Sequence, residues 1–482
     1  MKNKILRSFN SVDILWLSIA LLILLSLALL LPLSPQDYWW YLRLGQDVAH
    51  TGSVPTIDTY SFTQAGSLFF YQSWLAALLF WKTYQAGGIT LTFFLRAVVI
   101  AITYTLLWGL LRNAGAGPRL ASLLTLLAAL AGSSNWSFRP QLFIYPIFVL
   151  VLLILSKWSQ AEKRGLWLLP ILSMLWVNLH GSFPLLFILG AFAFLFGKGD
   201  KKQLALALGI SALTLFINPH GIYVLGYVMD MLSAPSNQKF SMEWMPMVNR
   251  GWQANLFFAW LLIFAPLAAS SPRKLTLLEW VNFIFFGWLA LLGIRYVIWF
   301  LFIMVILTAS LLAEWDARYL ESPVENEKPD INIFAACLLL LIPFLLMPGF
   351  RDTWWPDAPK AYDNANPIEA VKWLAVHPEL AGPLWSDFSY SSYLIFGLPS
   401  RPVWIDTRFE LYPTEQWEKY ISIANASPQW DQLLDDEKIQ LVMLFTDGEP
   451  LLISAMKNSG LWCEKYHDED SIVFSKSTGG CP

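Results

Sequence analysis

The chain has 482 residues, of which 56% are hydrophobic and only 14% are charged. Soluble globular domains carry roughly 25% charged residues, so this composition excludes an ordinary soluble domain. The formal net charge of −3 gives no basis for nucleic-acid binding, and we expect membrane lipids to surround much of the chain.

Long apolar segments with few charges recur up to residue 348, and several reach the roughly 20 residues needed to cross a bilayer. The segment 73–86 is predicted to be a helix that does not cross by itself. The predicted fold is a mostly α, polytopic transmembrane helical bundle of about 11–13 spans. The apolar segments that we assign as spans are 12–33, 89–111, 120–135, 142–156, 166–177, 183–197, 203–217, 255–269, 277–293, 296–313 and 331–348.

The basic residues between the spans predict the orientation of the chain. With the N-terminus in the cytoplasm, most Lys and Arg fall in inner loops, and the outer loops hold only Arg43, Arg139, Lys239, Arg250 and Arg295. This distribution follows the positive-inside rule. It predicts a multi-pass protein of the plasma (inner) membrane with long, aromatic-rich loops on the extracytoplasmic side.

The composition changes after residue 350, where charged residues become evenly spaced. We divide the chain into a transmembrane bundle at 1–350, with a first extracytoplasmic loop at 34–72, and a soluble extracytoplasmic α/β domain at 351–482. Cys463 and Cys481 can form a disulfide in that domain, and two free thiols are the alternative. The domain's pattern predicts strands at 383–387, 402–406, 439–445, 462–467 and 471–475, and helices at 367–376, 391–396, 414–424, 430–437 and 450–458.

The loop after the first span contains the first candidate catalytic residue. Asp37 is followed directly by Tyr38, Trp39, Trp40 and Tyr41. A carboxylate held among aromatic rings at the membrane surface is partly desolvated, which suits a general base, and a solvated loop carboxylate is the alternative.

A second loop carboxylate, Asp58, is either a second acid or the cap of the segment that follows it. The other outer loops offer cations and N–H donors for an anion. Arg139 and Gln141 flank Pro140, and Arg295 lies between two spans. A cation in or at the surface of the membrane usually has an anionic partner, and a phosphate is one such partner. The alternative is that an arginine at a span end extends its guanidinium to lipid headgroups.

Two histidines occur in similar settings. His180 lies in Asn-Leu-His-Gly and His220 in Asn-Pro-His-Gly. Both sequences place a ring nitrogen donor at the outer end of a span, and both are also ordinary helix-stop sequences.

In the C-terminal domain, Asp387 and Asp406 each end an apolar segment of strand length, and Arg408 follows closely. Ligands favour the carboxyl ends of strands in such sheets, and a strand-end ion pair is the alternative for Asp406 and Arg408. The sequence contains no Walker A loop, dinucleotide fingerprint, zinc-protease motif or nucleophile elbow.

The first loop has the pattern D-x-W-W-x-L-x-x-G from Asp37 to Gly45, then P-x-x-D-x-x-S from Pro55 to Ser61. This motif, which directly follows the first span, resembles the first extracytoplasmic loop of GT-C glycosyltransferases. These enzymes include protein O-mannosyltransferases and aminoarabinose transferases. The resemblance covers the first 90 or so residues, and beyond them only the layout of many spans and a C-terminal outer domain agrees.

The resemblance implies an enzyme that moves a sugar from a polyprenyl-phosphate donor to a glycan, lipid or protein acceptor on the extracytoplasmic side, with inversion. Asp37 would be the general base. Some relatives hold a divalent cation through the loop carboxylates and others do not, so the metal stays open. The residues expected to bind the donor phosphate or the substrate are Arg139, Gln141, His180, His220, Arg295, Trp39 and Trp40.

Three other functions fit the same composition. A polysaccharide ligase or polymerase would depend more on the loop 218–254 and its Arg250 than on Asp37. A transporter or flippase for lipid-linked sugars predicts paired ionisable residues near the bilayer midplane and internal repeats, and we find no repeat. A non-catalytic membrane scaffold would use the C-terminal domain to dock partners.

Overall fold

The computed structural model describes residues 10–161, 164–319, 328–477, 479 and 481. The chain forms two compact units, each built from separate stretches of sequence. The helical unit comprises Met1–Leu31, Ala86–Gly221 and Met242–Pro359. The α/β unit comprises Pro32–Gln85, Ile222–Ser241 and Lys360–Pro482, so it joins the loop after the first helix to the C-terminal part.

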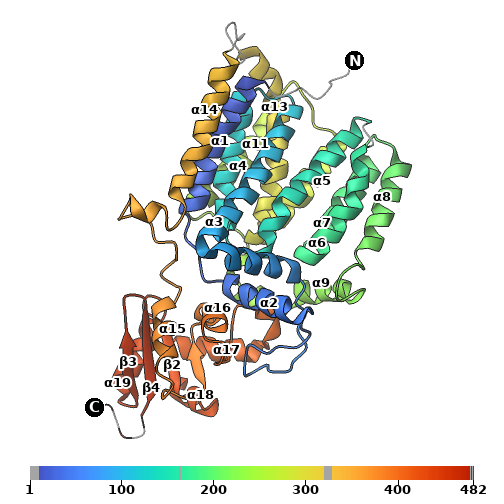
Figure 1. Ribbon diagram of the computed structural model, residues 1–482. Helices are drawn as coiled ribbons and strands as arrows, with labels where there is room; N and C mark the ends of the chain where they lie inside the picture. Colours follow the sequence, from blue (N-terminus) through green and yellow to red (C-terminus); the bar gives the residue numbers. More distant parts are fainter. Residues whose placement is uncertain (1–9, 162–163, 320–327, 478, 480, 482) are drawn as a thin grey trace. The chain divides into compact units, whose positions relative to one another are not determined.

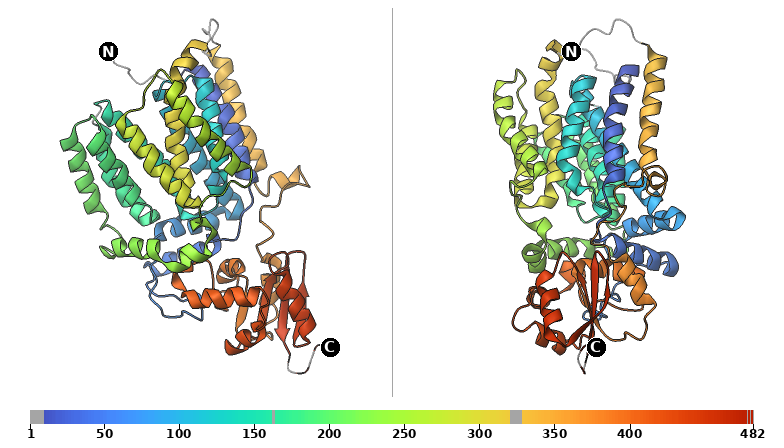
Figure 2. Two further views of the ribbon diagram at one scale, coloured as in Figure 1. Left: turned by 180° about the vertical axis from the view of Figure 1, so that it is seen from behind. Right: turned by 90° about the vertical axis from the view of Figure 1, so that its left-hand side faces the viewer.

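Each of the eleven predicted apolar segments coincides with helical structure in the helical unit. Helices far apart in the sequence pack together, as α1 does with α14 (Figures 1 and 2). The helices are α1 (Ser11–Leu30), the second part of α3 (Trp74–Asn113), α4 (Pro118–Gly132), α5 (Ile144–Ser159), α6 (Leu169–Leu179), α7 (Pro184–Phe196), α8 (Lys201–Thr214), α11 (Trp252–Ser270), α12 (Leu277–Leu292), α13 (Val297–Tyr319) and α14 (Pro329–Leu341).

Within the described residues, six helical segments are long and apolar enough to cross a membrane. On α14, the side chains of Ile331, Phe334 and Leu338 are exposed. Their spacing of three and four residues puts them on one helix face, as lipid-facing side chains would lie. The number of crossings and their direction stay predictions. The six segments are Ser11–Leu30, Trp74–Asn113, Pro140–Ser159, Trp252–Ser270, Ile294–Tyr319 and Pro329–Leu346, and shorter apolar helices lie at Gly165–Leu179, Pro184–Phe196 and Leu277–Leu292.

Helix α3 is two helices joined at a break. Gly87 and Gly88 have non-helical backbone angles, and Gly88 has φ of +58°, a left-handed conformation that glycine adopts without a Cβ clash. The part before the break belongs to the α/β unit and the part after it to the helical unit. The prediction of a separate helix at 73–86, followed by another at 89–111, is therefore confirmed.

The sheet of the α/β unit has four strands in the order β1-β2-β4-β3. Strand β1 pairs with β2 in parallel, and β4 pairs antiparallel with both β2 and β3. The strands are β1 (Leu384–Ser386), β2 (Leu441–Phe445), β3 (Trp462–His467) and β4 (Ser471–Lys476) (Figure 1).

Helices cover both faces of this sheet (Figure 2). Successive side chains of a strand point to opposite faces. Leu441 and Met443 accordingly pack in one apolar cluster, while Val442 and Leu444 pack in the other. The predicted α/β architecture is confirmed here. The first cluster includes side chains of α2 (Tyr38–Thr51), α15 (Ile368–Ala375) and α16 (Phe388–Gly397), and the second includes those of α17 (Thr414–Ala424), α18 (Trp430–Asp436) and α19 (Pro450–Ser459). Helices α9 (Tyr223–Ser233) and α10 (Pro235–Phe240) complete the unit.

The prediction of a sheet strand at 402–406 is wrong. This segment pairs with the first loop instead: Val403 N donates to Tyr60 O at 2.9 Å, and Phe62 N donates to Val403 O at 3.0 Å. Pro402 has no N–H to give to a ladder, so two hydrogen bonds to a loop replace a longer strand. Cys463 and Cys481 form a disulfide with their Cα atoms 5.3 Å apart.

Candidate functional site

Asp37 occupies the N-cap position of α2, yet its side chain does not cap the helix. The indole Nε1 of Trp40 donates to Asp37 Oδ1 at 3.4 Å and to Thr407 Oγ1 at 3.1 Å. Asp37 is half-buried, whereas the ring of Trp40 is buried. The carboxylate is thus partly accessible and is contacted by a donor fixed in the core of the α/β unit.

Trp39 anchors the start of α2. Its Nε1 donates to Asn366 Oδ1 at 2.7 Å, and its ring stacks on Phe396 at 5.5 Å and on Tyr362 at 6.0 Å between ring centres. Trp39 is 1% exposed. These contacts hold α2 against the C-terminal part of the chain, and substrate binding by Trp39 or Trp40 stays a prediction.

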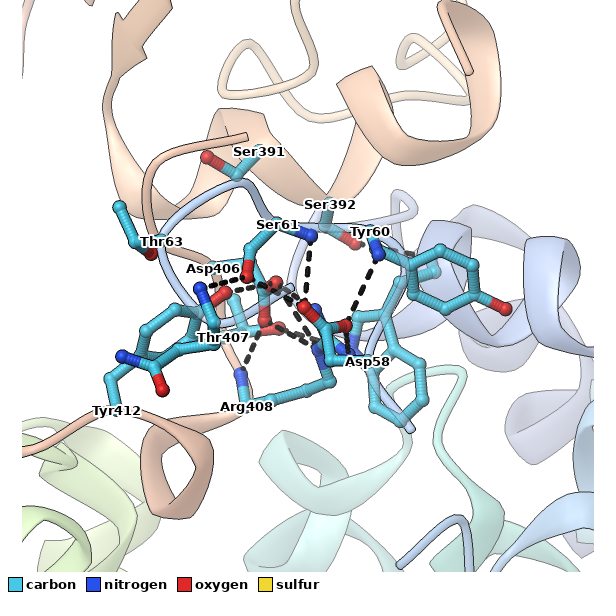
Figure 3. Close-up of polar contacts among 12 residues, drawn as sticks. Asp58, Tyr60, Ser61, Thr63, Ser391, Ser392, Asp406, Thr407, Arg408 and Tyr412 are labelled. Carbon is cyan, nitrogen blue, oxygen red and sulfur yellow. Dashed lines mark hydrogen bonds and ion pairs between the residues drawn. The ribbon is translucent and has the colours of Figure 1, made fainter. Parts of the chain in front are cut away.

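Asp58, Asp406 and Arg408 meet in one buried ion cluster (Figure 3). Arg408 makes a two-point contact with Asp406, from Nε to Oδ1 at 2.9 Å and from Nη2 to Oδ2 at 2.5 Å. Its Nη1 donates to Asp58 Oδ1 at 2.6 Å. The hydroxyls of Tyr71 and Tyr412 complete the cluster, which joins the first loop to the C-terminal part.

The cluster is closed to solvent, because Asp58, Asp406 and Arg408 are 1%, 0% and 2% exposed. Burial disfavours the charge of Arg408, but the interactions with Asp406, Tyr412 and Tyr71 together outweigh burial, so the pKa of Arg408 is raised well above its usual value. A buried cation with two carboxylate partners holds chain segments in place. Asp406 and Arg408 do form the ion pair of the alternative prediction, extended by Asp58, but Asp406 does not end a strand.

Asp387 caps α16, where its Oδ1 accepts from Ser389 N at 2.8 Å, and its Oδ2 accepts from the hydroxyl of Tyr420 at 2.9 Å. Glu449 lies beside it and is 5% exposed. Burial, reinforced by the charge of Asp387, raises the pKa of Glu449 to about 10. Glu449 was not predicted as a site residue, because a single Glu before a proline is typical of an ordinary helix start.

In the helical unit, three of the predicted outer-loop residues gather around Arg295 in η5 (Ile294–Tyr296). Gln141, in η2 (Pro140–Phe143), donates from Nε2 to Arg295 O at 3.4 Å. Arg139 precedes η2, and His180 follows α6. Gln141, two residues after Arg139, thus links the segments of the two arginines, and the charges of both arginines act on His180. We refer to Arg139, His180 and Arg295 as the cationic cluster.

Two residues that were not predicted as site residues contact the arginines of this cationic cluster. In η4 (Met242–Trp244), Glu243 forms an ion pair with Arg139, and the ring of Trp244 lies 4.4 Å from the guanidinium carbon of Arg295. The available signal was an acidic residue beside a tryptophan in a long outer loop, which is too common a pattern to select.

His180 is the neutral member of the cationic cluster. Burial, followed by the charges of Arg295 and Arg139, lowers the pKa of His180 to about 3. Its Nδ1 accepts from Ser182 N at 3.1 Å, which leaves the proton of the neutral ring on Nε2. His180 therefore offers one N–H donor and no charge at neutral pH.

His220 lies in a turn stabilised by Asn218, whose Oδ1 accepts from His220 N at 2.7 Å and whose Nδ2 donates to Gly221 O at 3.0 Å. Gly221 has φ of +55°. These contacts are those of a helix-stop turn, and phosphate binding by His220 stays a prediction.

Within the described residues, no group of three or more His, Cys, Asp or Glu could hold a metal ion. The oxygens of Asp58 are directed at a guanidinium and at hydrogen-bond donors: Oδ1 accepts from Arg408, and Oδ2 accepts from Ser61 N at 3.0 Å and Ser61 Oγ at 2.6 Å. Asp58 therefore does not fit as a metal ligand shared with Asp37.

The fold of this chain is similar to that of solved glycosyltransferases of the GT-C type, so the resemblance inferred from the first loop is confirmed at the level of the fold. The Archaeoglobus fulgidus oligosaccharyltransferase, tethered with an acceptor peptide containing the NVT sequon, is similar with a TM-score of 0.58 and 13% identity over 96% of this chain and 74% of that chain. The same archaeal enzyme in complex with an inhibitory peptide and a dolichol-phosphate gives 0.52 and 12% over 96% and 75%.

A second enzyme, arabinofuranosyltransferase AftD from mycobacteria, is similar with a TM-score of 0.53 and 13% identity over 95% of this chain and 41% of that chain. No family model matches the sequence, and no curated protein matches it significantly. At such identities, the similarity establishes the fold alone.

Proposed function

We propose that this protein is a membrane glycosyltransferase that moves a sugar from a polyprenyl-phosphate donor to an acceptor on the extracytoplasmic side, with inversion at the anomeric carbon. The observation that carries the proposal is the cationic cluster of Arg139, His180 and Arg295 at helix ends of a GT-C fold. The archaeal structure in complex with a dolichol-phosphate supports a lipid phosphate as the ligand class.

The cationic cluster has the chemistry that a departing lipid phosphate requires. Guanidinium groups form two-point, charge-assisted hydrogen bonds with phosphate oxygens. Neutral His180 adds an N–H donor without further charge. Because donors fixed in advance stabilise charge that develops on the leaving oxygen, Arg139 and Arg295 would lower the barrier as well as bind the donor.

Asp37 is the proposed general base. The acceptor oxygen or nitrogen attacks the anomeric carbon and forms the new glycosidic bond, while the bond from that carbon to the phosphate oxygen breaks. The electron pair of the broken bond stays on the polyprenyl phosphate, and the acceptor proton passes to Asp37. Asp58 acts only within the buried ion cluster because its oxygens are already engaged.

The test is donor consumption by purified protein with a panel of polyprenyl-phosphate sugars, comparing wild type with Asp37→Asn. Loss of a general base lowers the rate by roughly 10²–10⁴-fold, with donor binding retained. The matched control is Asp47→Asn on the same helix, because Asp47 pairs with Arg43 at 3.0 Å and has no part in the proposed chemistry. Equal donor consumption by wild type and Asp37→Asn would remove Asp37 from the mechanism.

A further inference from the structure

A cavity of about 430 Å³ opens at the surface of the α/β unit. The first loop contributes Phe62 and Thr63 to its lining, and the start of α17 and the end of α18 contribute the rest. Sites for small ligands range from roughly 300 to 1,000 Å³, so this cavity is large enough to hold one. None of the residues that line it belongs to the buried ion cluster or to the cationic cluster.

Two polar side chains of the cavity, Gln416 and Thr63, are held in place by hydrogen bonds. Gln416 is 8% exposed, and its Nε2 donates to Thr63 Oγ1 at 2.9 Å and to Trp404 O at 2.8 Å. Its Oε1 accepts from Gln64 Nε2 at 3.2 Å, and the Thr63 hydroxyl donates to Trp404 O at 2.7 Å. All side-chain hydrogens of Gln416 and Thr63 are therefore engaged, whereas each oxygen can accept one more hydrogen bond. These two side chains can receive hydrogen bonds from a ligand but cannot donate any.

Charged side chains also line the cavity. They comprise three carboxylates and two ammonium groups, a formal excess of one negative charge: Glu415, Asp436, Glu437, Lys419 and Lys438. Lys419 Nζ pairs with Glu437 Oε1 at 2.6 Å. Among the described residues, Glu415 and Asp436 form no ion pair, and both are exposed. Their carboxylates can therefore accept hydrogen bonds from a ligand.

A neutral ligand rich in hydroxyl groups matches this set of side chains. Each hydroxyl donates one hydrogen bond, which the carboxylates and the two neutral acceptors can receive, and it accepts others, which the ammonium groups can donate. An ionised phosphate can only accept, so it obtains no hydrogen bond from Gln416 or Thr63, and the carboxylates repel it. Phe62 is half-buried against the core and also lines the cavity, where its ring offers apolar surface to the C–H face of a sugar.

We propose that this cavity binds sugar residues of the acceptor, so that the acceptor is a glycan rather than a protein or a lipid. This inference rests on the proposed function, because it names the acceptor of the transfer reaction. The phosphate of the donor is assigned to the cationic cluster, whereas this cavity carries an excess of carboxylates. The cavity therefore suits the substrate that has no phosphate.

The test is a saturation-transfer NMR titration of the full-length protein, in a detergent without a sugar headgroup, with neutral trisaccharides of glucose, galactose, mannose and arabinose. Glu415→Ala removes one exposed carboxylate, so the affinity for the trisaccharide that binds should fall by roughly 3–10-fold, the contribution of one hydrogen bond. The matched control is Glu418→Ala on the same helix, because Glu418 pairs with Lys239 at 2.7 Å and does not line the cavity.

A second variant protects the test against loss of the fold. Lys438, at the end of α18, has φ of +57°, a left-handed conformation that favours glycine. Lys438→Gly removes an ammonium group of the cavity without straining the backbone, so the sugar affinity should fall while Tm is retained. Unchanged affinity in both Lys438→Gly and Glu415→Ala would overturn the inference, and so would the absence of binding by every trisaccharide.

The charge of the ligand separates a glycan site from other kinds of site. The 6-phosphate of the sugar that binds should bind more weakly than the neutral sugar, and added salt should leave the affinity for the neutral sugar unchanged. Tighter binding of the 6-phosphate would make the cavity an anion site. Binding of a peptide that Glu415→Ala abolishes would assign the cavity to a protein acceptor. Either result would contradict the inference.

Sugar binding is measured without donor or turnover, so the two proposals fail separately. If Asp37→Asn is as active as wild type, the proposed base fails and the cavity is judged by binding alone. If Asp37→Asn is inactive and no neutral sugar binds, only the glycan site fails. In active protein, Glu415→Ala should raise the KM for a glycan acceptor more than it lowers kcat, which a purely structural role would not do.

Discussion

The two charged clusters of this molecule differ in what surrounds their arginines. Arg408 is sealed in the α/β unit, where two carboxylates and the hydroxyl of Tyr71 contact it. Arg139 and Arg295, in the helical unit, belong to a cluster with a neutral histidine, and the side chains of Arg139 and Glu243 are 20% and 34% exposed. A buried arginine whose donors are bonded to carboxylates stabilises the fold, whereas a solvent-accessible arginine can exchange its partner for a ligand.

This difference also separates the two carboxylates of the first loop. Asp58 is fully buried in the ion cluster, and Asp37 keeps part of its surface accessible. Both belong to the motif that resembles GT-C enzymes, so the motif contains one residue suited to hold the loop and one suited to react.

The largest expected effect is that of Arg408→Met. It leaves the carboxylates of Asp58 and Asp406 buried without their cation, which costs about 3–5 kcal/mol in the free energy of unfolding. Arg43→Met, which removes the half-exposed partner of Asp47, should cost less than about 1 kcal/mol. Unfolding of detergent-solubilised protein measures both values. Similar losses of unfolding free energy in the two variants would contradict the different roles of the buried and the partly exposed arginines.

The next effect is a pH dependence of stability from Glu449. Its pKa is raised to about 10 in the folded state, so its contribution to stability is complete below about pH 4.5 and is lost as the pH rises toward 10. The slope is at most about 1.4 kcal/mol per pH unit. Glu449→Gln should flatten the dependence of Tm on pH, and an unchanged slope would show that Glu449 is already ionised.

The smallest expected effect concerns the cationic cluster. Glu243 competes with a phosphate for Arg139, so Glu243→Gln should tighten binding of a polyprenyl phosphate by roughly 1.5–5-fold, the range of an exposed ion pair. The control is Glu279→Gln, which removes the partner of Arg273, a pair of comparable exposure in the helical unit. Weaker binding in Glu243→Gln would make the carboxylate part of the ligand site rather than a competitor.

The helices were predictable from the sequence because their signals are local. Each apolar segment of span length contains a helix, and the predicted bounds of α17 and β3 agree with the structure. The segment at 402–406 was mispredicted because its partner is the first loop, more than 300 residues earlier, and no local pattern identifies such a partner.

The candidate site was predictable in part for the same reason. Arg139, His180 and Arg295 stand out locally as polar residues at span ends, but their gathering depends on how helices pack. The contact between Trp40 and Asp37 was not predicted, because Trp40 was expected to bind substrate. Thr407, the other acceptor of the Trp40 indole, comes from the distant C-terminal part, which no local pattern identifies. The role of Glu243 could not be predicted, because it depends on the ion pair with Arg139, which lies about 100 residues earlier in the sequence.

The oxidation state of the C-terminal cysteines indicates the cellular compartment in which the C-terminal domain folds. Cys463 and Cys481 are bonded and Cys337 is a free thiol, so unreduced protein has one sulfur to alkylate and reduced protein has three. Disulfides persist in oxidising compartments and are rare in the cytosol. The stoichiometry of alkylation in cells therefore reports on which side of the membrane this domain matured.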